Sequence, residues 1–319
     1  MFGLLGLFGL FMAGYLASPT TDDAADPDDA PQGGDADAGR AGRPTEPSDE
    51  GMPFSDDIDD EIDPPLFMGG TAGSDILNGG SGDDWLSGGE ARDALAGSDG
   101  DDTLLGGVGE DDLNGGAGDD HLVGGGGADQ VMGDAGDDTI YGWPGDDRLH
   151  GGAGADSIAG GLGHDTVLGG EGADALQGGG GDDWLAGGEG DDWMAGDAGN
   201  DTLDGGAGDD RMDGGAGRDY LNAGEGNDVL RLSGETHATG GAGADLFEVA
   251  VGGTSVIADY DGREDRLVVV YDPMEGQEEP EVSLQVDGAD ALILLDGQVL
   301  ARVADGAGLT LADIQIRPV

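Results

Sequence analysis

Residues 205–222 read GGAGDDRMDGGAGRDYLN, which is two nine-residue units placed end to end. Gly205 and Asp210 of the first unit return nine residues later as Gly214 and Asp219. If such units stack on one another, their aspartates come to lie side by side. The repeat therefore predicts both a regular fold and a concentrated negative charge that something must neutralise.

The nine-residue register runs unbroken from Gly70 to Arg231, which is 231 − 70 + 1 = 162 residues, or 18 units. The first position is glycine in all units but one (Ala223), and so is the fourth (Ala91 is its exception). The eighth position is always Leu, Ile, Val or Met. After the irregular stretch LSGETHAT (232–239), one more unit returns as GGAGADLFE (240–248). Internal periodicity of this kind is the signature of a repeat architecture.

The sixth position is aspartate in every unit. These candidate metal ligands are Asp75, Asp84, Asp93, Asp102, Asp111, Asp120, Asp129, Asp138, Asp147, Asp156, Asp165, Asp174, Asp183, Asp192, Asp201, Asp210, Asp219, Asp228 and Asp245.

Composition limits the partners of the chain. The 319 residues hold 71 glycines, and Lys+Arg total 11 against 70 for Asp+Glu, a net charge of −59. Such acidity excludes nucleic acid as a partner and favours a cation. Acidic, glycine-rich chains are usually disordered, but the strict period argues against that here. With no cysteine, disulfides and thiolate metal sites are excluded, and the zero count fits an exported protein.

Two segments precede the repeats. Residues 1–17, MFGLLGLFGLFMAGYLA, are apolar and uncharged. We slightly favour a retained membrane anchor, with membrane contact through this segment, over a cleaved signal peptide, and a wrongly assigned start codon stays open as a third interpretation. Residues 18–68 are rich in Asp, Pro, Gly and Ala and are predicted to be an acidic, disordered linker.

Each unit is expected to consist of a GGxGxD loop followed by a three-residue strand. Neighbouring strand residues point to opposite faces, so the eighth position faces inward and the seventh and ninth face outward. Two units make one flattened coil, and units 18 residues apart stack at about 4.8 Å. Asp75 then lies over Asp93, and Asp84 over Asp102. The predicted fold is all-β, a parallel β-roll (β-solenoid) over residues 69–248.

Stacked aspartates point to a metal. Two carboxylates about 5 Å apart repel by roughly 3 kcal/mol at an effective dielectric of 20, and one buried aliphatic per unit does not offset the ordering of nine residues. Calcium suits the oxygen-rich loops because it accepts six to eight oxygen ligands in flexible geometry, whereas magnesium demands a tight octahedron. Zinc prefers His or Cys. Eighteen units give 18 − 2 = 16 stacked pairs and so up to about 16 Ca²⁺ ions.

Residues 249–319 change in character. Glycine becomes rarer and alternating apolar runs appear, including DRLVVVY (265–271) and ALILLDGQVLARV (291–303). Asp296-Gly297 is a two-residue hairpin signal between two of these runs. Residues 249–319 are therefore predicted to form a β cap on the roll.

The unit resembles the calcium-binding nonapeptide GGxGxDxUx of the RTX (repeats-in-toxin), hemolysin-type family, over residues 70–231 and 240–248. The resemblance implies a parallel β-roll with calcium between successive loops, and export by type I secretion machinery that reads an uncleaved C-terminal signal. VIADYDGREDRLVVV (256–270) and GLTLADIQI (308–316) resemble the C-terminal β cap of serralysin-like members, so residues 249–319 also hold a candidate secretion signal. The apolar residues 1–17 depart from the family pattern.

No catalytic role is predicted. The HExxH and GxSxG motifs are absent. Exposed Thr residues form no regular ladder of the kind that ice binding needs. Two further sets of side chains each allow a functional and a non-functional interpretation. For the histidines we favour solvent-facing side chains over a zinc cluster. For the tryptophans we favour scattered outward aromatics over a surface that stacks on sugars. The histidines are His121, His150, His164 and His237, and the aromatics are Trp85, Trp184 and Trp193.

Two functions are weighed. The first is a calcium-dependent structural or interaction protein, extracellular or at the cell surface, with a cell-surface polysaccharide or protein as its partner. The second is a non-catalytic accessory or export module of an RTX enzyme or toxin system. A neighbouring gene for a secretion machine would favour the second, and direct binding to cells or polysaccharide the first.

Overall fold

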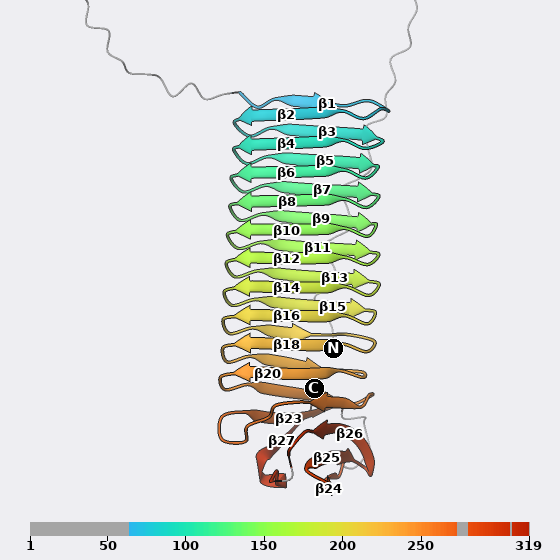
Figure 1. Cartoon of the computed structure of the whole chain (residues 1–319), viewed down its shortest axis with the longest axis vertical. Helices are drawn as coiled ribbons and strands as arrows, with labels where there is room; N and C mark the ends of the chain where they lie inside the picture. The colour runs from blue at the N-terminus through green and yellow to red at the C-terminus, as the bar shows by residue number, and fades with distance from the viewer. Residues whose placement is uncertain (1–63, 273–279, 307, 319) are drawn as a thin grey trace, which may run out of the picture. The chain divides into compact units, whose positions relative to one another are not determined.

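The computed structural model describes residues 64–272, 280–306 and 308–318. The predicted apolar segment 1–17 and most of the predicted linker, residues 18–63, lie outside these ranges. The described residues form an all-β, parallel roll in which two sheets stack coil upon coil (Figure 1). Within these residues, no helix has the length and hydropathy to cross a bilayer.

One sheet has 13 strands, in the order β1-β3-β5-β7-β9-β11-β13-β15-β17-β19-β21-β23-β27. Their bounds are β1 Phe67–Gly69, β3 Trp85–Glu90, β5 Thr103–Val108, β7 His121–Gly126, β9 Thr139–Pro144, β11 Ser157–Leu162, β13 Ala175–Gly180, β15 Trp193–Ala198, β17 Arg211–Asp213, β19 Val229–Leu232, β21 Leu246–Ala250, β23 Arg266–Tyr271 and β27 Ile314–Pro318.

The other sheet has 14 strands, in the order β2-β4-β6-β8-β10-β12-β14-β16-β18-β20-β22-β26-β25-β24. Their bounds are β2 Ile76–Ser81, β4 Ala94–Asp99, β6 Asp112–Ala117, β8 Gln130–Ala135, β10 Arg148–Ala153, β12 Thr166–Glu171, β14 Trp184–Glu189, β16 Thr202–Ala207, β18 Tyr220–Glu225, β20 His237–Ala242, β22 Ser255–Ile257, β26 Gln298–Val303, β25 Asp290–Leu295 and β24 Val282–Asp287.

The predicted stacking register is confirmed. Ser157 of β11 pairs in parallel with Thr139 of β9, 18 residues earlier, and the same offset recurs along the repeats. The predicted strand length is wrong, because most repeat strands have six residues rather than three. Each strand runs on through the glycine pair of the next unit, since the residues at positions 2 and 3 still pair in parallel, as Gly161 with Gly179 and Leu162 with Gly180 do.

Each sheet contributes one row of side chains to the core. The eighth-position residues face inward from both sheets, as predicted: Leu104 and Leu122 of one sheet and Leu113 and Val131 of the other are fully buried in the same cluster. The first position also faces inward, and there a bare Cα is needed. A Cβ on Gly142 would lie 2.5 Å from Asp147 Oδ2 and 2.5 Å from the carbonyl oxygen of Gly160. Both distances are too short for carbon, so glycine at position 1 makes room for the buried aspartate.

The irregular stretch 232–239 belongs to the roll. Thr236 is buried in place of the sixth-position aspartate, and the His237 amide donates to the Asp219 carbonyl, as seventh-position amides do in regular units. The hydroxyl of Thr236 donates to the carbonyl oxygen of Ser233 at 2.5 Å. The coil thus continues with one residue fewer and a neutral group where the charge would be.

The C-terminal strands continue both sheets without the nine-residue period. β23 stacks in parallel on β21, and β27 on β23. The predicted hairpin is confirmed: β25 and β26 are antiparallel around Asp296-Gly297, and both turn residues have positive φ. β21 crosses the boundary predicted at residue 249, and a short 3-10 turn, Leu311–Asp313, precedes β27.

Regular structure begins two residues before the predicted start at 69, because β1 pairs with β3. Met68 of β1 packs against the buried core, while the neighbouring Phe67 is 79% exposed. Among the described residues that precede the repeats, 64–69, Met68 therefore contributes to the cover of the first coil and Phe67 does not.

Replacing Gly142 by Ala should destabilise the roll by about 1–3 kcal/mol, because the new methyl overlaps Asp147 Oδ2 and a backbone carbonyl. Urea unfolding in saturating calcium, followed by circular dichroism, measures the change. Gly126→Ala is the matched control, since nothing lies within 4 Å of its added Cβ. Equal stability of the two variants would contradict the packing described for position 1.

Candidate metal centre

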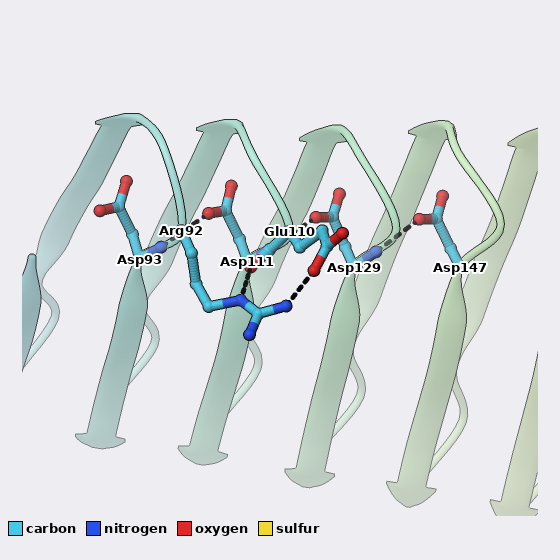
Figure 2. Close-up of polar contacts among 6 residues, drawn as sticks. All are labelled: Arg92, Asp93, Glu110, Asp111, Asp129 and Asp147. Carbon is cyan, nitrogen blue, oxygen red and sulfur yellow. Dashed lines mark hydrogen bonds and ion pairs between the residues drawn. The ribbon is translucent and has the colours of Figure 1, made fainter. Parts of the chain in front are cut away.

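The sixth-position aspartates form two ladders, one along each edge of the roll. In each ladder the amide of one aspartate donates to Oδ1 of the aspartate one coil later. Figure 2 shows one stretch, in which Asp93, Asp111, Asp129 and Asp147 are linked by N···Oδ1 distances of 2.8 Å. The predicted juxtaposition of these side chains is therefore present, and one oxygen of each carboxylate is used to join coils.

Between the ends of the ladders, the second oxygen of each carboxylate has no hydrogen-bond partner. Oδ2 is buried and unpartnered in 17 successive register aspartates, from Asp84 through Asp228. The side chains themselves are almost fully buried, with Asp129 and Asp201 at 0% exposure. A buried carboxylate oxygen without a donor or a cation is strongly unfavourable. This row of oxygens is the feature of the repeats that calls for a ligand.

Burial raises the pKa of the register carboxyls from Asp102 onward. The pKa of Asp147 rises to about 7, chiefly through loss of hydration; the Asp129 amide opposes this and the charges of Asp129 and Asp165 add to it. Asp120 and Asp210 likewise rise to about 7, again mainly through burial. Without a cation, the folded ladders therefore retain protons near neutral pH.

The ladders have distinct ends. Asp75 is only partly buried, and its Oδ2 accepts hydrogen bonds from the amide and hydroxyl of Thr71. At the other end, the Asp245 amide donates to Asp265 Oδ1 at 3.1 Å. Asp265 thus extends one ladder past the repeats, and sequence analysis missed it because its spacing from Asp245 is 20 residues rather than 18.

Asp259 is a second carboxylate that the sequence analysis missed. Its two oxygens accept the amides of Gly240 and Gly241 at 2.9 Å each. The segment that carries it, VIADYDGREDRLVVV, was singled out only for its resemblance to a cap. The acidic ladder at this end is therefore bounded by carboxylates of the C-terminal segment.

An exposed ion pair lies beside one ladder. Figure 2 shows Arg92, next to Asp93, reaching to the following coil. Its Nε donates to the Glu110 carbonyl oxygen at 2.9 Å, and its guanidinium pairs with the Glu110 carboxylate. Both side chains are more than 60% exposed, so the pair contributes little to stability. It leaves the buried Oδ2 atoms without a partner.

The other candidate residues lie apart from the ladders. Trp85, Trp184 and Trp193 face outward, as predicted. His164 stands in the outer turn, where its Nδ1 accepts the Asp182 amide at 2.8 Å. Across the ranges 64–272, 280–306 and 308–318, no group of three or more His, Asp or Glu side chains is placed to hold a metal ion. A cation in the roll would therefore use main-chain oxygens beside the carboxylates.

Eight overlapping matches to the family model "RTX calcium-binding nonapeptide repeat" together cover residues 69–230, about half of the chain. The chain belongs to the RTX calcium-binding nonapeptide repeat family. The resemblance drawn from the motif is thereby confirmed, and calcium is the ligand of such repeats. A comparison with curated proteins finds no match.

Two solved structures similar to this RTX chain are the extracellular lipase LipA from Serratia marcescens and the AlgE6R3 subunit of the Azotobacter vinelandii mannuronan C5-epimerase. The lipase is 17% identical with a TM-score of 0.28, over 74% of this chain and 40% of the lipase chain. The epimerase subunit is 23% identical with a TM-score of 0.21, over 40% of this chain and 79% of the subunit. The RTX chain thus spans less than half of the lipase's length.

The donors of this RTX chain fit calcium. Asp147 Oδ2 and the Gly160 carbonyl oxygen both lie close to the space where a side chain at Gly142 would be. An anionic oxygen and a neutral oxygen therefore face the same small space. Hard oxygens of both kinds are the ligands that calcium prefers. When bound, calcium supplies positive charge to carboxylates that are otherwise buried without a counterion. Asp Oδ2 and neighbouring glycine carbonyls are the groups of this chain that would hold it.

Asp147→Ala should reduce the calcium-induced β signal more than Asp75→Ala. Asp147 is linked both to Asp129 and to Asp165, whereas Asp75 has only Asp93 on its ladder and is partly hydrated. Because each repeat depends on its neighbours, loss of Asp147 interrupts the array and loss of Asp75 frays one end. Circular dichroism at subsaturating calcium compares the two variants. An equal or larger effect at Asp75 would show that the ladder register is wrong.

The calcium-free roll should be more structured at pH 5 than at pH 8. The folded-state pKa values of about 6 to 7 lie above the usual 3.8, so the folded state binds more protons between these limits and its stability falls as pH rises through them. Protein stripped of calcium on a chelating resin is followed by circular dichroism across this range. A β signal that is flat or rises with pH would contradict this expectation.

Proposed function

We propose that this RTX protein is a secreted or cell-surface structural or interaction protein whose roll folds on binding many calcium ions. The observation that carries the proposal is the row of 17 buried, unpartnered Oδ2 atoms. A net charge of −59 opposes a compact metal-free state, and divalent ions would offset it. Sixteen ions, one for each stacked pair of the 18-unit array, would supply +32.

The ligand set proposed is the row of sixth-position aspartates, Asp75 through Asp228 together with Asp245. Calcium would thereby act as part of the fold, since metal binding and folding are linked when no site exists in the unfolded chain. We assign the protein no catalytic activity: its sixth-position carboxylates belong to the ladders, and the sequence has neither the HExxH nor the GxSxG motif.

Residues 249–319 are proposed to act as the cap of the roll. A repeat array needs a terminal element that covers its apolar column and its open strand edges. Phe247 and Leu267 are fully buried in continuation of the core, which supports this role. Export through type I secretion machinery, guided by this C-terminal region, is the route that family membership supports, and residues 1–17 are proposed as a membrane anchor.

Folding should require calcium specifically. In excess chelator at pH 7.5 the full chain should lose most of its β signal in circular dichroism, and millimolar calcium should restore it because the cation removes the carboxylate repulsion. Magnesium at the same concentration should restore much less, since it demands tight octahedral coordination. Full β content in chelator, with metal loss verified by elemental analysis, would overturn the proposal.

A further inference from the structure

The outer face of the 13-stranded sheet is uncharged over five consecutive strands, β5, β7, β9, β11 and β13, whose rows alternate in Figure 1 with strands of the other sheet. Their sequences, TLLGGV, HLVGGG, TIYGWP, SIAGGL and ALQGGG, contain no Asp, Glu, Lys or Arg. Each intervening strand of the other sheet, from β6 to β14, carries at least one charge. In a chain with 70 carboxylates, only one of the two sheets has such a surface.

We call these five strands the neutral face. Two columns of outward side chains run along it. The seventh-position column holds the hydrogen-bonding groups of Thr103, His121, Thr139 and Ser157, paired coil to coil. An exposed tryptophan lies at each end of this column. Trp85 pairs with Thr103 at one end, and Trp193 pairs with Ala175 at the other.

An apolar hollow of about 420 Å³ lies in the middle of the neutral face. Its walls include Tyr141, Trp143, Pro144 and Leu162, and backbone of β11 forms much of the rest. Trp143 is 60% exposed and Leu162 66%. Contiguous exposed apolar surface surrounded by polar residues is typical of a binding site.

The backbone at this hollow is strained. Trp143 occupies position 2, where most units have glycine, and it adopts φ of +74°. A bulky side chain at positive φ is a rare outlier. The ladder between β7 and β9 runs only to Val123↔Tyr141, whereas the ladder between β9 and β11 continues to Pro144↔Leu162. Strain of this kind concentrates at functional sites, and here it holds an indole out from the sheet.

We infer that the neutral face binds an uncharged polysaccharide chain lying along the axis of the roll. Flat aromatic rings stack on the apolar faces of sugar rings, and Thr, Ser and His side chains exchange hydrogen bonds with sugar hydroxyls. The face offers both in parallel columns and offers no charge. Polyanions are disfavoured, because acidic turns border the face on both edges. This inference rests on the proposed function, of which it names the partner.

The size of the neutral face argues against a protein partner. Five strands of six residues span about 24 by 20 Å, or about 480 Å². A stable protein interface needs about 800 Å² from each side. A single extended glycan is narrow enough to be bound within these limits, and the tryptophans at both ends of the column lengthen its track.

The test uses the full chain in saturating calcium, with retention measured by affinity electrophoresis. The probes are the neutral glycans hydroxyethyl cellulose, laminarin and dextran, with carboxymethyl cellulose as the charged counterpart. At least one neutral glycan should retain the protein, and carboxymethyl cellulose should retain it less than hydroxyethyl cellulose does. Retention of the charged polymer alone, or of none, would overturn the inference.

Two variants on the face keep the fold and remove the site. Trp143→Gly restores the glycine usual at position 2, and Leu162→Glu places a charge that the same position carries in Glu171 and Glu189. Each should weaken retention about tenfold, because Trp143→Gly removes one stacking partner and Leu162→Glu replaces apolar wall by a charge. Their matched controls on the other sheet are Trp184→Thr and Ala135→Glu, which should leave retention unchanged.

Circular dichroism with and without calcium accompanies each measurement. A roll that keeps its β signal in chelator overturns the calcium proposal, whereas a calcium-folded roll that fails to bind neutral glycans overturns only the present inference. Equal losses in face and control variants would also overturn it. Sedimentation velocity adds one more outcome: a dimer abolished by Leu162→Glu would assign the neutral face to a second copy of the chain instead.

Discussion

The structure depends on one contact, the hydrogen bond from the amide of one register aspartate to Oδ1 of the next aspartate on its ladder. It joins each coil to its neighbour at the turn, where strand pairing ends. The same contact orients the carboxylate so that Oδ2 points into the roll, as in Asp129 and Asp147. The carboxylates that connect one coil to the next are therefore the same carboxylates that need a cation.

That coupling explains the rest of the unit. A first-position side chain would crowd the inward carboxylate, which explains why glycine fills that position in all units of the array but one, where Ala223 replaces it. The inward eighth-position side chains fill the space between the sheets, and each sheet contributes one such row, for example Leu104 and Leu122 from one and Leu113 from the other. Such a thin core is a weak source of stability for so many ordered residues, so the bound cations become part of the structure rather than an addition to it.

The outward positions are free of these demands, and there the two sheets differ. Charges are spread over the 14-stranded sheet, as solubility requires of a surface. The neutral face of the 13-stranded sheet lacks them and carries Trp143 at a position where glycine would be easier. Because neither feature helps the roll to form, both are explained by what the face contacts.

The nine-residue period by itself determined the fold class, the 18-residue stacking offset, the buried eighth position and the set of ladder aspartates, because a strict repeat leaves one way to superimpose identical units. Outside the repeats, the Asp296-Gly297 turn signal between two alternating apolar runs located the C-terminal hairpin. Only the tertiary structure decided how the two oxygens of each carboxylate are used, that strands such as Ser157–Leu162 run through the glycine pair, and that Asp265 extends a ladder. Those features depend on distances between coils. The neutral face was hidden for the same reason, since its strands alternate along the chain with charged ones and come together only when alternate units stack on one side.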